Sequence, residues 1–371
     1  MKITKLETFF VKPRWLFLKI STDEGLVGWG EPVVEGRSQT VAAAVQEIGR
    51  YLIGEDPRRI EHHWQAIYRG QFYRGGAVLC SALSGIEQAL WDITGKWLGQ
   101  PVYQLLGGAT RERIRMYGWV HGESFGDYIE SAKVRATEGF TAIKMGVSGA
   151  MEPIDTLERV EFEVERFAAV RGAVGKAVDI GIDFHGRVSP AMAVRLARAL
   201  EPDAPLFIEE PVLCENVDAM VTVARSTTIP IATGERLFTK WGFREVLEKQ
   251  AAFVLQPDLS HAGGILECKK IAAMAECYYA VIAPHCPLGP IALAACLQLD
   301  ACIPNFLAQE HVTLGVGYLK QPFTIEQGYI ALPTAPGLGI EVDEEALQSQ
   351  LYDGSWETPR LWHVDGSVAD W

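Results

Sequence analysis

Six acidic or histidine residues recur along the chain at nearly constant spacing. Each lies 23 to 27 residues after the one before it, close to the length of one strand–helix unit, and each stands where a short apolar run ends. If these runs are parallel strands of a closed barrel, equivalent positions on successive strands face the same end of that barrel. We therefore expect one ring around a barrel mouth, made of Asp183, Glu209, Glu235, Asp258, His285 and Glu310.

Asp183, Glu209 and Glu235 are three carboxylates on consecutive predicted strands. Like charges crowded together are unfavourable unless a cation compensates them. Three hard oxygen ligands with open positions for water and substrate suit Mg²⁺ better than zinc. Taken singly, Asp183 is explained as a helix N-cap and Glu235 as a salt-bridge partner of Arg236, but three carboxylates in phase favour a magnesium site.

Two histidines flank this trio. His185 lies two residues beyond Asp183, so strand alternation points both to the same face. His285 ends a strand three units after Glu209 and is expected to face the trio across the mouth, with Asp258 placed to orient it and raise its basicity. The remaining histidines are expected to pack or to cap helices, and His261 to cap the helix that follows it: His62, His63, His121, His261, His311 and His363.

A metal, a His–Asp base and an opposing histidine suggest β-elimination from a hydroxy acid. The substrate carboxylate would bind Mg²⁺, the base would remove the proton on the next carbon, and the metal would stabilise the enediolate. The second histidine would protonate the β-hydroxyl, so that it leaves as water. We expect Glu310 to donate a hydrogen bond to the enediolate if it is kept protonated, and Lys144 to neutralise the same charge.

The strands that position these residues are predicted from apolar runs alternating with helix-like stretches across residues 115–328. Such runs indicate parallel strands with crossover helices, and eight of them fit a (β/α) barrel better than an open doubly wound sheet. One helix is expected to begin with Ser189 as N-cap and Pro190 in its first turn. The predicted strands cover 115–120, 141–145, 178–184, 206–209, 230–233, 253–256, 279–283 and 305–309.

The flanking regions have other patterns. Residues 1–114 open with two strand-like segments joined by a turn and then show helical periodicity over 82–93, ending near Gly95 and Gly99, which indicates an α+β module. Residues 329–371 carry prolines, glycines and several tryptophans. We expect this tail to pack back on the first region.

Composition and net charge disfavour several classes of binding partner and cellular location. The net charge of −13 disfavours nucleic acid and anionic membranes as partners, and no run approaches the roughly 20 apolar residues of a membrane helix. The N-terminus is too polar for a signal peptide, so we expect a cytoplasmic protein. The seven cysteines are odd in number and show no C-x-x-C pair, which favours buried free thiols.

The motifs resemble, nearly end to end, the mandelate racemase-like part of the enolase superfamily, and within it the acid-sugar dehydratases. The segments that carry the resemblance are PRW at 13–15, GWGEP at 28–32, FYRGG at 72–76, QALWDI at 88–93, DFHGR at 183–187, FIEEP at 207–211, GER at 234–236, LQPDLSHAGG at 255–264 and APHCPLGP at 283–290.

The resemblance implies an α/β architecture. An N-terminal α+β capping domain (1–114) would cover a modified TIM barrel, (β/α)₇β (115–328), and a C-terminal segment (329–371) would complete the cap. It also implies the carboxylate trio as Mg²⁺ ligands, His285 as base on the C2 proton and His185 as acid to the C3 hydroxyl. The expected product is a 2-keto-3-deoxy sugar acid.

The resemblance also marks substrate contacts. Arg14 and Trp15 in the cap, with Lys144 and Arg187 in the barrel, are expected to bind substrate, although strand packing explains Trp15 nearly as well. Family members with a Lys-x-Lys pair use the second lysine as a base. Here that position is Gly146, which disfavours a two-base racemase.

The substrate stays open among sugar acids. D-Galactonate comes first, with gluconate, arabinonate or a similar acid as rivals, because segments 148–177 and 311–332 depart from the pattern of galactonate-specific relatives. A racemase or cycloisomerase is less favoured, and a non-catalytic homologue that binds or assembles is the alternative from a different class. We expect a homo-oligomer, as is common for symmetric barrels.

Overall fold

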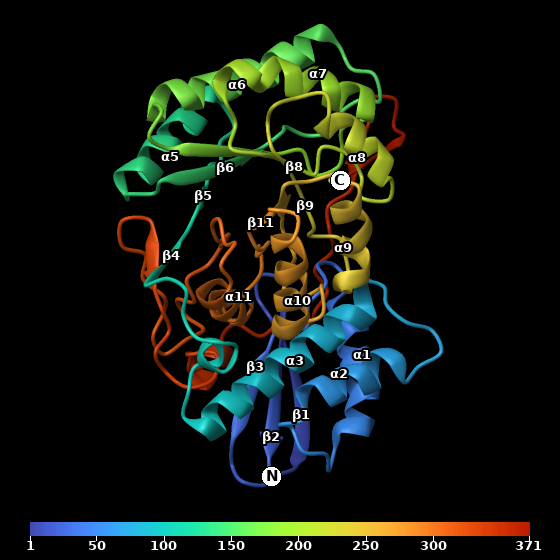
Figure 1. Cartoon of the computed structure of the whole chain (residues 1–371), viewed down its shortest axis with the longest axis vertical. Helices are drawn as coiled ribbons and strands as arrows, with labels where there is room; N and C mark the ends of the chain where they lie inside the picture. Colours follow the sequence, from blue (N-terminus) through green and yellow to red (C-terminus); the bar gives the residue numbers. More distant parts are fainter.

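The computed structural model describes residues 1–371, and its N-terminal part is a three-stranded antiparallel sheet covered by helices. The sheet has the order β1 (Ile3–Val11), β2 (Trp15–Thr22) and β3 (Val27–Gly30), and α1 (Ser38–Leu52), α2 (Ile60–Arg69) and α3 (Ala77–Leu98) pack beside it (Figure 1). Glycines permit close contact between α3 and β3, since a Cβ at Gly28 would lie 2.1 Å from the Ala89 carbonyl oxygen. The predicted α+β module and its long helix are therefore present.

Seven parallel strands form the second sheet, in the order β11-β10-β9-β8-β7-β6-β5. Their sequence neighbours are also their spatial neighbours, as a barrel built from successive strand–helix units requires. The strands are β5 (Gly118–Trp119), β6 (Ala142–Gly146), β7 (Asp179–Asp183), β8 (Ile208–Glu209), β9 (Ile231–Thr233), β10 (Val254–Leu255) and β11 (Val281–Ile282). The helices that follow them are α5 (Phe125–Thr137), α6 (Leu157–Val174), α7 (Pro190–Leu200), α8 (Val217–Ala224), α9 (Thr239–Glu248), α10 (Ile265–Glu276) and α11 (Pro290–Cys302).

Residues 305–309 close the barrel without forming a regular strand. Phe306 bridges to Ile282 beside β11, and Gln309 bridges to Met116 just before β5, both in parallel orientation. The backbone N–H of Tyr117 donates to the Gln309 carbonyl at 3.0 Å, which joins the last segment to the first. The predicted α/β class, an N-terminal cap-like module plus a modified TIM barrel, is confirmed.

Two local predictions have opposite outcomes. The Ser189 side chain accepts a hydrogen bond from the Met192 N–H, with Pro190 at the first helical position, so the predicted start of α7 is confirmed. The prediction that His261 caps the next helix is wrong. Its Nδ1 lies 2.9 Å from the Ser81 Oγ of α3, and α10 begins after Gly264, which supplies no side-chain cap.

The C-terminal tail contacts two different parts of the molecule. In its first part, β12 (Tyr329–Ala331) pairs with β4 (Arg113–Arg115). After α12 (Glu344–Gln348), Leu351 bridges to Val11 of β1. Its last part forms a hairpin of β13 (Leu361–Trp362) and β14 (Val368–Ala369), and the chain ends beside α8, far from the N-terminus (Figure 1). The tail therefore touches both the first region and the barrel. The remaining short helix is α4 (Val102–Leu105), and η1 (Glu201–Asp203) is a 3₁₀ turn.

The prediction of buried free cysteines is confirmed in part. All seven cysteines are free, and five of them are buried, whereas Cys214 is half-buried and Cys277 is exposed. None of the helices is both long and apolar enough to cross a membrane.

Candidate active site

Three carboxylates converge at the carboxyl ends of β7, β8 and β9. Asp183 ends β7 and is in register with Glu209, which ends β8, while Glu235 follows β9 by two residues. Ligand oxygens of the three side chains all lie within 4.8 Å of one another. The structure thus brings together the trio predicted from spacing alone, and this group could hold a metal ion.

The trio lies in a poorly solvated setting. The side chains of Asp183 and Glu209 are at most 1% exposed, and that of Glu235 is 14% exposed. Burial raises the pKa of all three carboxyl groups and neighbouring carboxylates raise it further, whereas Lys144 opposes the rise at Asp183 and Glu209. Bringing three negative charges together in this setting is unfavourable, so a divalent cation would be strongly favoured there.

His285 lies beside the trio with one nitrogen fixed. Its Nδ1 is 2.8 Å from Asp258 Oδ2, and its Nε2 is 3.5 Å from Glu235 Oε2. Burial disfavours the charged imidazole, but Glu235 and Asp258 outweigh it and hold the pKa of His285 well above its ordinary value. The contact with Asp258 leaves Nε2 as the nitrogen directed to the trio.

His185 lies on the opposite side of the ring of strands, with β8, β9 and β10 between β7 and β11. Its Nε2 is 3.3 Å from Asp183 Oδ2. The residue has φ of 51°, a left-handed conformation that is strained for a side chain other than glycine, and its N–H donates to Asp183 Oδ1 at 2.8 Å. Burial lowers the pKa of His185 to about 3, with Arg187 and Lys144 adding to the effect, so the imidazole is neutral here.

Lys144, on β6, lies in a buried cluster of ionisable side chains. Its Nζ is 2.7 Å from Glu209 Oε2, 2.9 Å from Glu310 Oε1 and 3.6 Å from Asp183 Oδ2. Although burial disfavours the charged amine, these carboxylates raise the pKa of Lys144 well above its ordinary value. Lys144 thus compensates carboxylates of the site itself, and its role in neutralising the enediolate stays a prediction.

Glu310 lies between Lys144 and His285, which both affect its protonation. Burial raises its pKa, but Lys144 and His285 lower it more, to about 2. Its Oε1 accepts from the Trp119 Nε1–H and its Oε2 from the Cys286 N–H, each at 2.8 Å. The lowered pKa favours the ionised form of Glu310 in this state, and its role as a donor when protonated stays a prediction.

The predicted substrate contacts have different surroundings. Arg14 forms an ion pair of 2.6 Å with Glu35 and donates to the Pro287 carbonyl, which brings it near the segment of His285. Trp15 is buried and its ring lies 5.2 Å from that of Tyr318, as core packing would predict. The Arg187 guanidinium lies 5.6 Å from the centroid of the Trp371 ring, and it donates a hydrogen bond to the Gly149 carbonyl. A substrate contact by Trp15 therefore stays a prediction beside a clear packing role.

Two aromatic residues of the site were not predicted. Trp119 lies in register with Lys144 and stacks towards His185, with ring centroids 6.5 Å apart. It precedes Lys144 by 25 residues, so the same spacing could have identified it. Trp371 contacts His185 at 5.6 Å from the end of the tail, and no periodic pattern marks that position.

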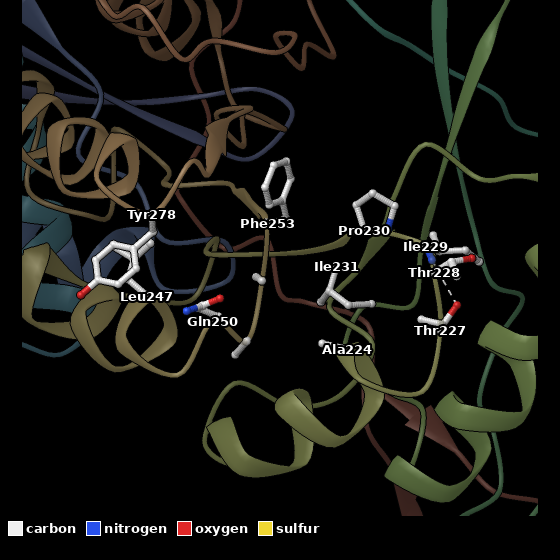
Figure 2. A pocket seen from close by; sticks show the side chains of 12 residues that line it. Ala224, Thr227, Thr228, Ile229, Pro230, Ile231, Leu247, Gln250, Phe253 and Tyr278 are labelled. Atoms are coloured by element: carbon white, nitrogen blue, oxygen red, sulfur yellow. Dashed lines mark hydrogen bonds between the residues drawn. The ribbon is translucent and has the colours of Figure 1, made fainter.

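The other end of the barrel has a separate cavity. A hollow of about 320 Å³ is lined by residues that precede β9 and β10, including Thr228, Pro230, Gln250 and Phe253 (Figure 2). These residues lie at the amino ends of the strands, whereas the carboxylates lie at the carboxyl ends. The hollow is therefore not part of the titratable cluster.

Known proteins match both parts of the chain. Residues 7–107 match the mandelate racemase/muconate lactonizing enzyme N-terminal domain, and residues 127–346 match the enolase C-terminal domain-like family. The D-galactonate dehydratase of Ralstonia nicotianae is 52% identical over 382 residues, and that of Variovorax paradoxus is 51% identical, each match covering 100% of both chains.

Solved structures show the same likeness. A mandelate racemase/muconate lactonizing enzyme from a Sulfitobacter species superposes with a TM-score of 0.91 at 38% identity, over 95% of this chain and 96% of that one. One from a Jannaschia species gives 0.91 at 34% identity, over 97% and 99%. This chain belongs to the mandelate racemase/muconate lactonizing enzyme family of the enolase superfamily.

Proposed function

We propose that the protein is a Mg²⁺-dependent hydro-lyase that dehydrates a sugar acid, with D-galactonate as its substrate and 2-dehydro-3-deoxy-D-galactonate and water as products. One observation carries the proposal. Two imidazoles from opposite sides of the strand ring each place Nε2 beside the carboxylate trio, 3.3 Å from Asp183 and 3.5 Å from Glu235. The names of the relatives, at about half identity over the whole length, point to the same substrate.

The residues present fit Mg²⁺. The proposed ligands, Asp183, Glu209 and Glu235, offer only hard oxygen atoms, with no thiolate among them, as magnesium prefers. Bound there, Mg²⁺ would neutralise negative charge on the substrate carboxylate as the neighbouring proton leaves. Lys144 would hold Glu209 and Glu310 in place on the side of the site next to β6.

The histidines would carry out the proton transfers. Glu235 raises the pKa of His285, and a cation held by the trio would offset that charge and favour the neutral imidazole. Neutral His285 would then take the C2 proton at Nε2 while Asp258 stabilises the imidazolium through Nδ1. The electron pair of the broken C2–H bond first moves towards the carboxylate, giving an enediolate, and then forms the C2=C3 bond as the C3–O bond breaks. His185 gives a proton to the departing hydroxyl, which leaves as water, and the resulting enol rearranges to the 2-keto acid. The substrate anion would raise the low pKa of His185 and so favour the protonated imidazole that this step needs.

We also propose the division of the chain into a capping domain (1–114), a barrel (115–328) and a returning segment (329–371). The family matches support it, since one ends at residue 107 and the other begins at 127. Arg14 and Arg187 are proposed to contact substrate, one from each of these first two parts.

The test is a turnover screen. Purified protein with Mg²⁺ would be offered five- and six-carbon aldonates and aldarates, and 2-keto-3-deoxy products would be measured. We expect turnover to concentrate on D-galactonate and to disappear in His285→Asn and His185→Asn, with the parent protein as the matched control. Turnover concentrated on another acid would keep the mechanism and replace the substrate, whereas full activity in either histidine variant would contradict the proposal.

A further inference from the structure

A hairpin of the tail covers the site on the β7 side. β13 and β14 pair through Leu361 with Ala369 and Trp362 with Val368. His363 Nδ1 lies 3.1 Å from Glu152 Oε1, which ties the hairpin to the loop after β6. The hairpin, the loop after β7 and the start of α8 enclose a cavity of about 310 Å³. The end of the chain is thus held at the barrel mouth.

The side chain of Trp371 contacts the site directly. The Trp371 ring meets the His185 imidazole edge-on, with centroids 5.6 Å apart at 88°, and the Arg187 guanidinium lies 5.6 Å over the same indole. Trp119 stacks towards His185 at 6.5 Å and 22°. His185 is therefore bounded by two indoles, one on β5 and one on the tail.

His185 has few other constraints on its ring. Its Nδ1 is buried without a hydrogen-bond partner, and only its Nε2 approaches a polar group, Asp183. An imidazole that transfers a proton must be oriented, commonly by a hydrogen bond at its second nitrogen. Here aromatic packing takes the place of that bond, because Trp119 and Trp371 restrict rotation of the ring from two directions.

Part of the Trp371 ring remains available. The residue is 45% exposed, although its ring contacts a group of the site. An exposed indole beside a polar pocket is a suitable surface for the C–H groups of a sugar chain, and Arg187 adds a cation beside it. If the trio holds the carboxylate end and His185 serves C3, the indole adjoins the carbons beyond C3.

We infer that Trp371 positions His185 for proton transfer and forms the wall against which the distal carbons of the sugar acid pack. This inference rests on the proposed function. Trp371 is a positioning and specificity residue, and it adds a side chain of the β13–β14 segment to a site whose titratable groups lie at strand ends.

The experiment separates the two proton transfers. Substrate would be incubated in D₂O with Mg²⁺, and deuterium at C2 of recovered substrate would be measured alongside product. Exchange at C2 needs His285 alone, whereas product needs both His285 and His185. We expect Trp371→Ala to form product about 10- to 100-fold more slowly while still exchanging C2, as His185→Asn should, because a misplaced group loses rate on this scale. Trp371→Phe keeps an aromatic ring and should recover most of the rate.

A matched control lies on the same hairpin. Trp362 is 57% exposed, so Trp362→Ala should leave both kcat and KM unchanged. The ratio of kcat/KM for six-carbon over five-carbon acids should fall in Trp371→Ala, because the distal wall is lost. Parental kcat and KM in Trp371→Ala, or equal loss of exchange and product, would overturn the inference. A parent protein that neither exchanges nor dehydrates any acid would instead overturn the proposed function.

Discussion

At the scale of single residues, the tautomer of His285 is the feature on which base chemistry depends. When the imidazole is neutral, a carboxylate at 2.8 Å from Nδ1 favours the proton on that nitrogen and leaves the lone pair on Nε2. Asp258 is itself held, since its Oδ1 accepts from the Ser260 N–H at 2.7 Å. The orientation of the base therefore derives from a backbone turn after β10.

Asp258→Asn should reduce kcat by about 10²- to 10⁴-fold, because an amide can hold the imidazole in the wrong tautomer and cannot stabilise its cation. Steady-state kinetics on the substrate found in the screen would measure the loss, and a Mg²⁺ titration should show unchanged metal affinity. Asp218→Asn, an exposed change on α8, is the control. Near-parental kcat in Asp258→Asn would exclude the dyad.

Spacing predicted the placement of the titratable residues because a strand–helix unit has a nearly constant length. The same argument omitted Trp119, whose position fits the spacing but whose side chain carries no charge that would attract notice. The protonation states of these residues were less predictable than their positions. The state of Glu310 depends on Lys144 and His285 around it, and such three-dimensional neighbours are not visible in the sequence.

At the scale of elements, two barrel helices have their first turns satisfied by carboxylates from the N-terminal part. Glu87 of α3 accepts from the N–H groups of Ile265 and Leu266 at 2.7 and 2.9 Å, where α10 begins. Glu31 accepts from Gly289 and from Ala292, at the start of α11. The glycines at both N-caps supply no side chain for this purpose, so the N-terminal part completes the barrel helices.

Glu87→Ala should lower the free energy of unfolding by about 2 to 4 kcal/mol, because it leaves a buried and a partly buried N–H group without acceptors. Denaturant unfolding of the whole chain would measure the change. Glu61→Ala on α2 removes an exposed pair with Lys270 and should cost less than about 1 kcal/mol. Equal losses in the two variants would contradict a capping role for Glu87.

α11 contains a buried acid with no partner. Neither carboxyl oxygen of Asp300 has a hydrogen bond, and burial raises its pKa well above the ordinary value. The folded state therefore holds a proton that the unfolded state releases, so this group reduces stability as pH rises above its unfolded pKa. Asp300→Asn should remove that loss of stability. The free energies of unfolding at pH 5 and at pH 8 should therefore differ less in the variant than in the parent. An unchanged pH dependence would show that Asp300 does not titrate.

Element boundaries were predictable only in part. Apolar runs located all eight barrel segments, yet several pair over only two or three residues, because pairing depends on where neighbouring strands overlap. Segment 305–309 looks like a strand in sequence but forms isolated bridges. The partner of His261, on α3, is 180 residues away, and no local signal indicates such a contact.

At the scale of the whole molecule, the site joins segments from residue 119 to residue 371, so its stability and that of the fold are linked. Three buried carboxylates gather only in the folded chain, whereas the unfolded chain disperses them. A cation that binds the folded state alone stabilises it by mass action, about 2.7 kcal/mol at a hundred times its Kd.

Added Mg²⁺ should therefore raise the thermal midpoint by a few degrees, and a chelator should reverse the shift without unfolding the chain at room temperature. Glu235→Gln should reduce the shift, because it removes one of the three proposed ligands while Lys144 continues to compensate the other two. NaCl at matched ionic strength controls for screening. A metal bound by the trio requires a shift that Mg²⁺ causes and NaCl at the same ionic strength does not, and that depends on Glu235. Equal shifts in parent and variant, or an equal shift with NaCl alone, would therefore contradict it.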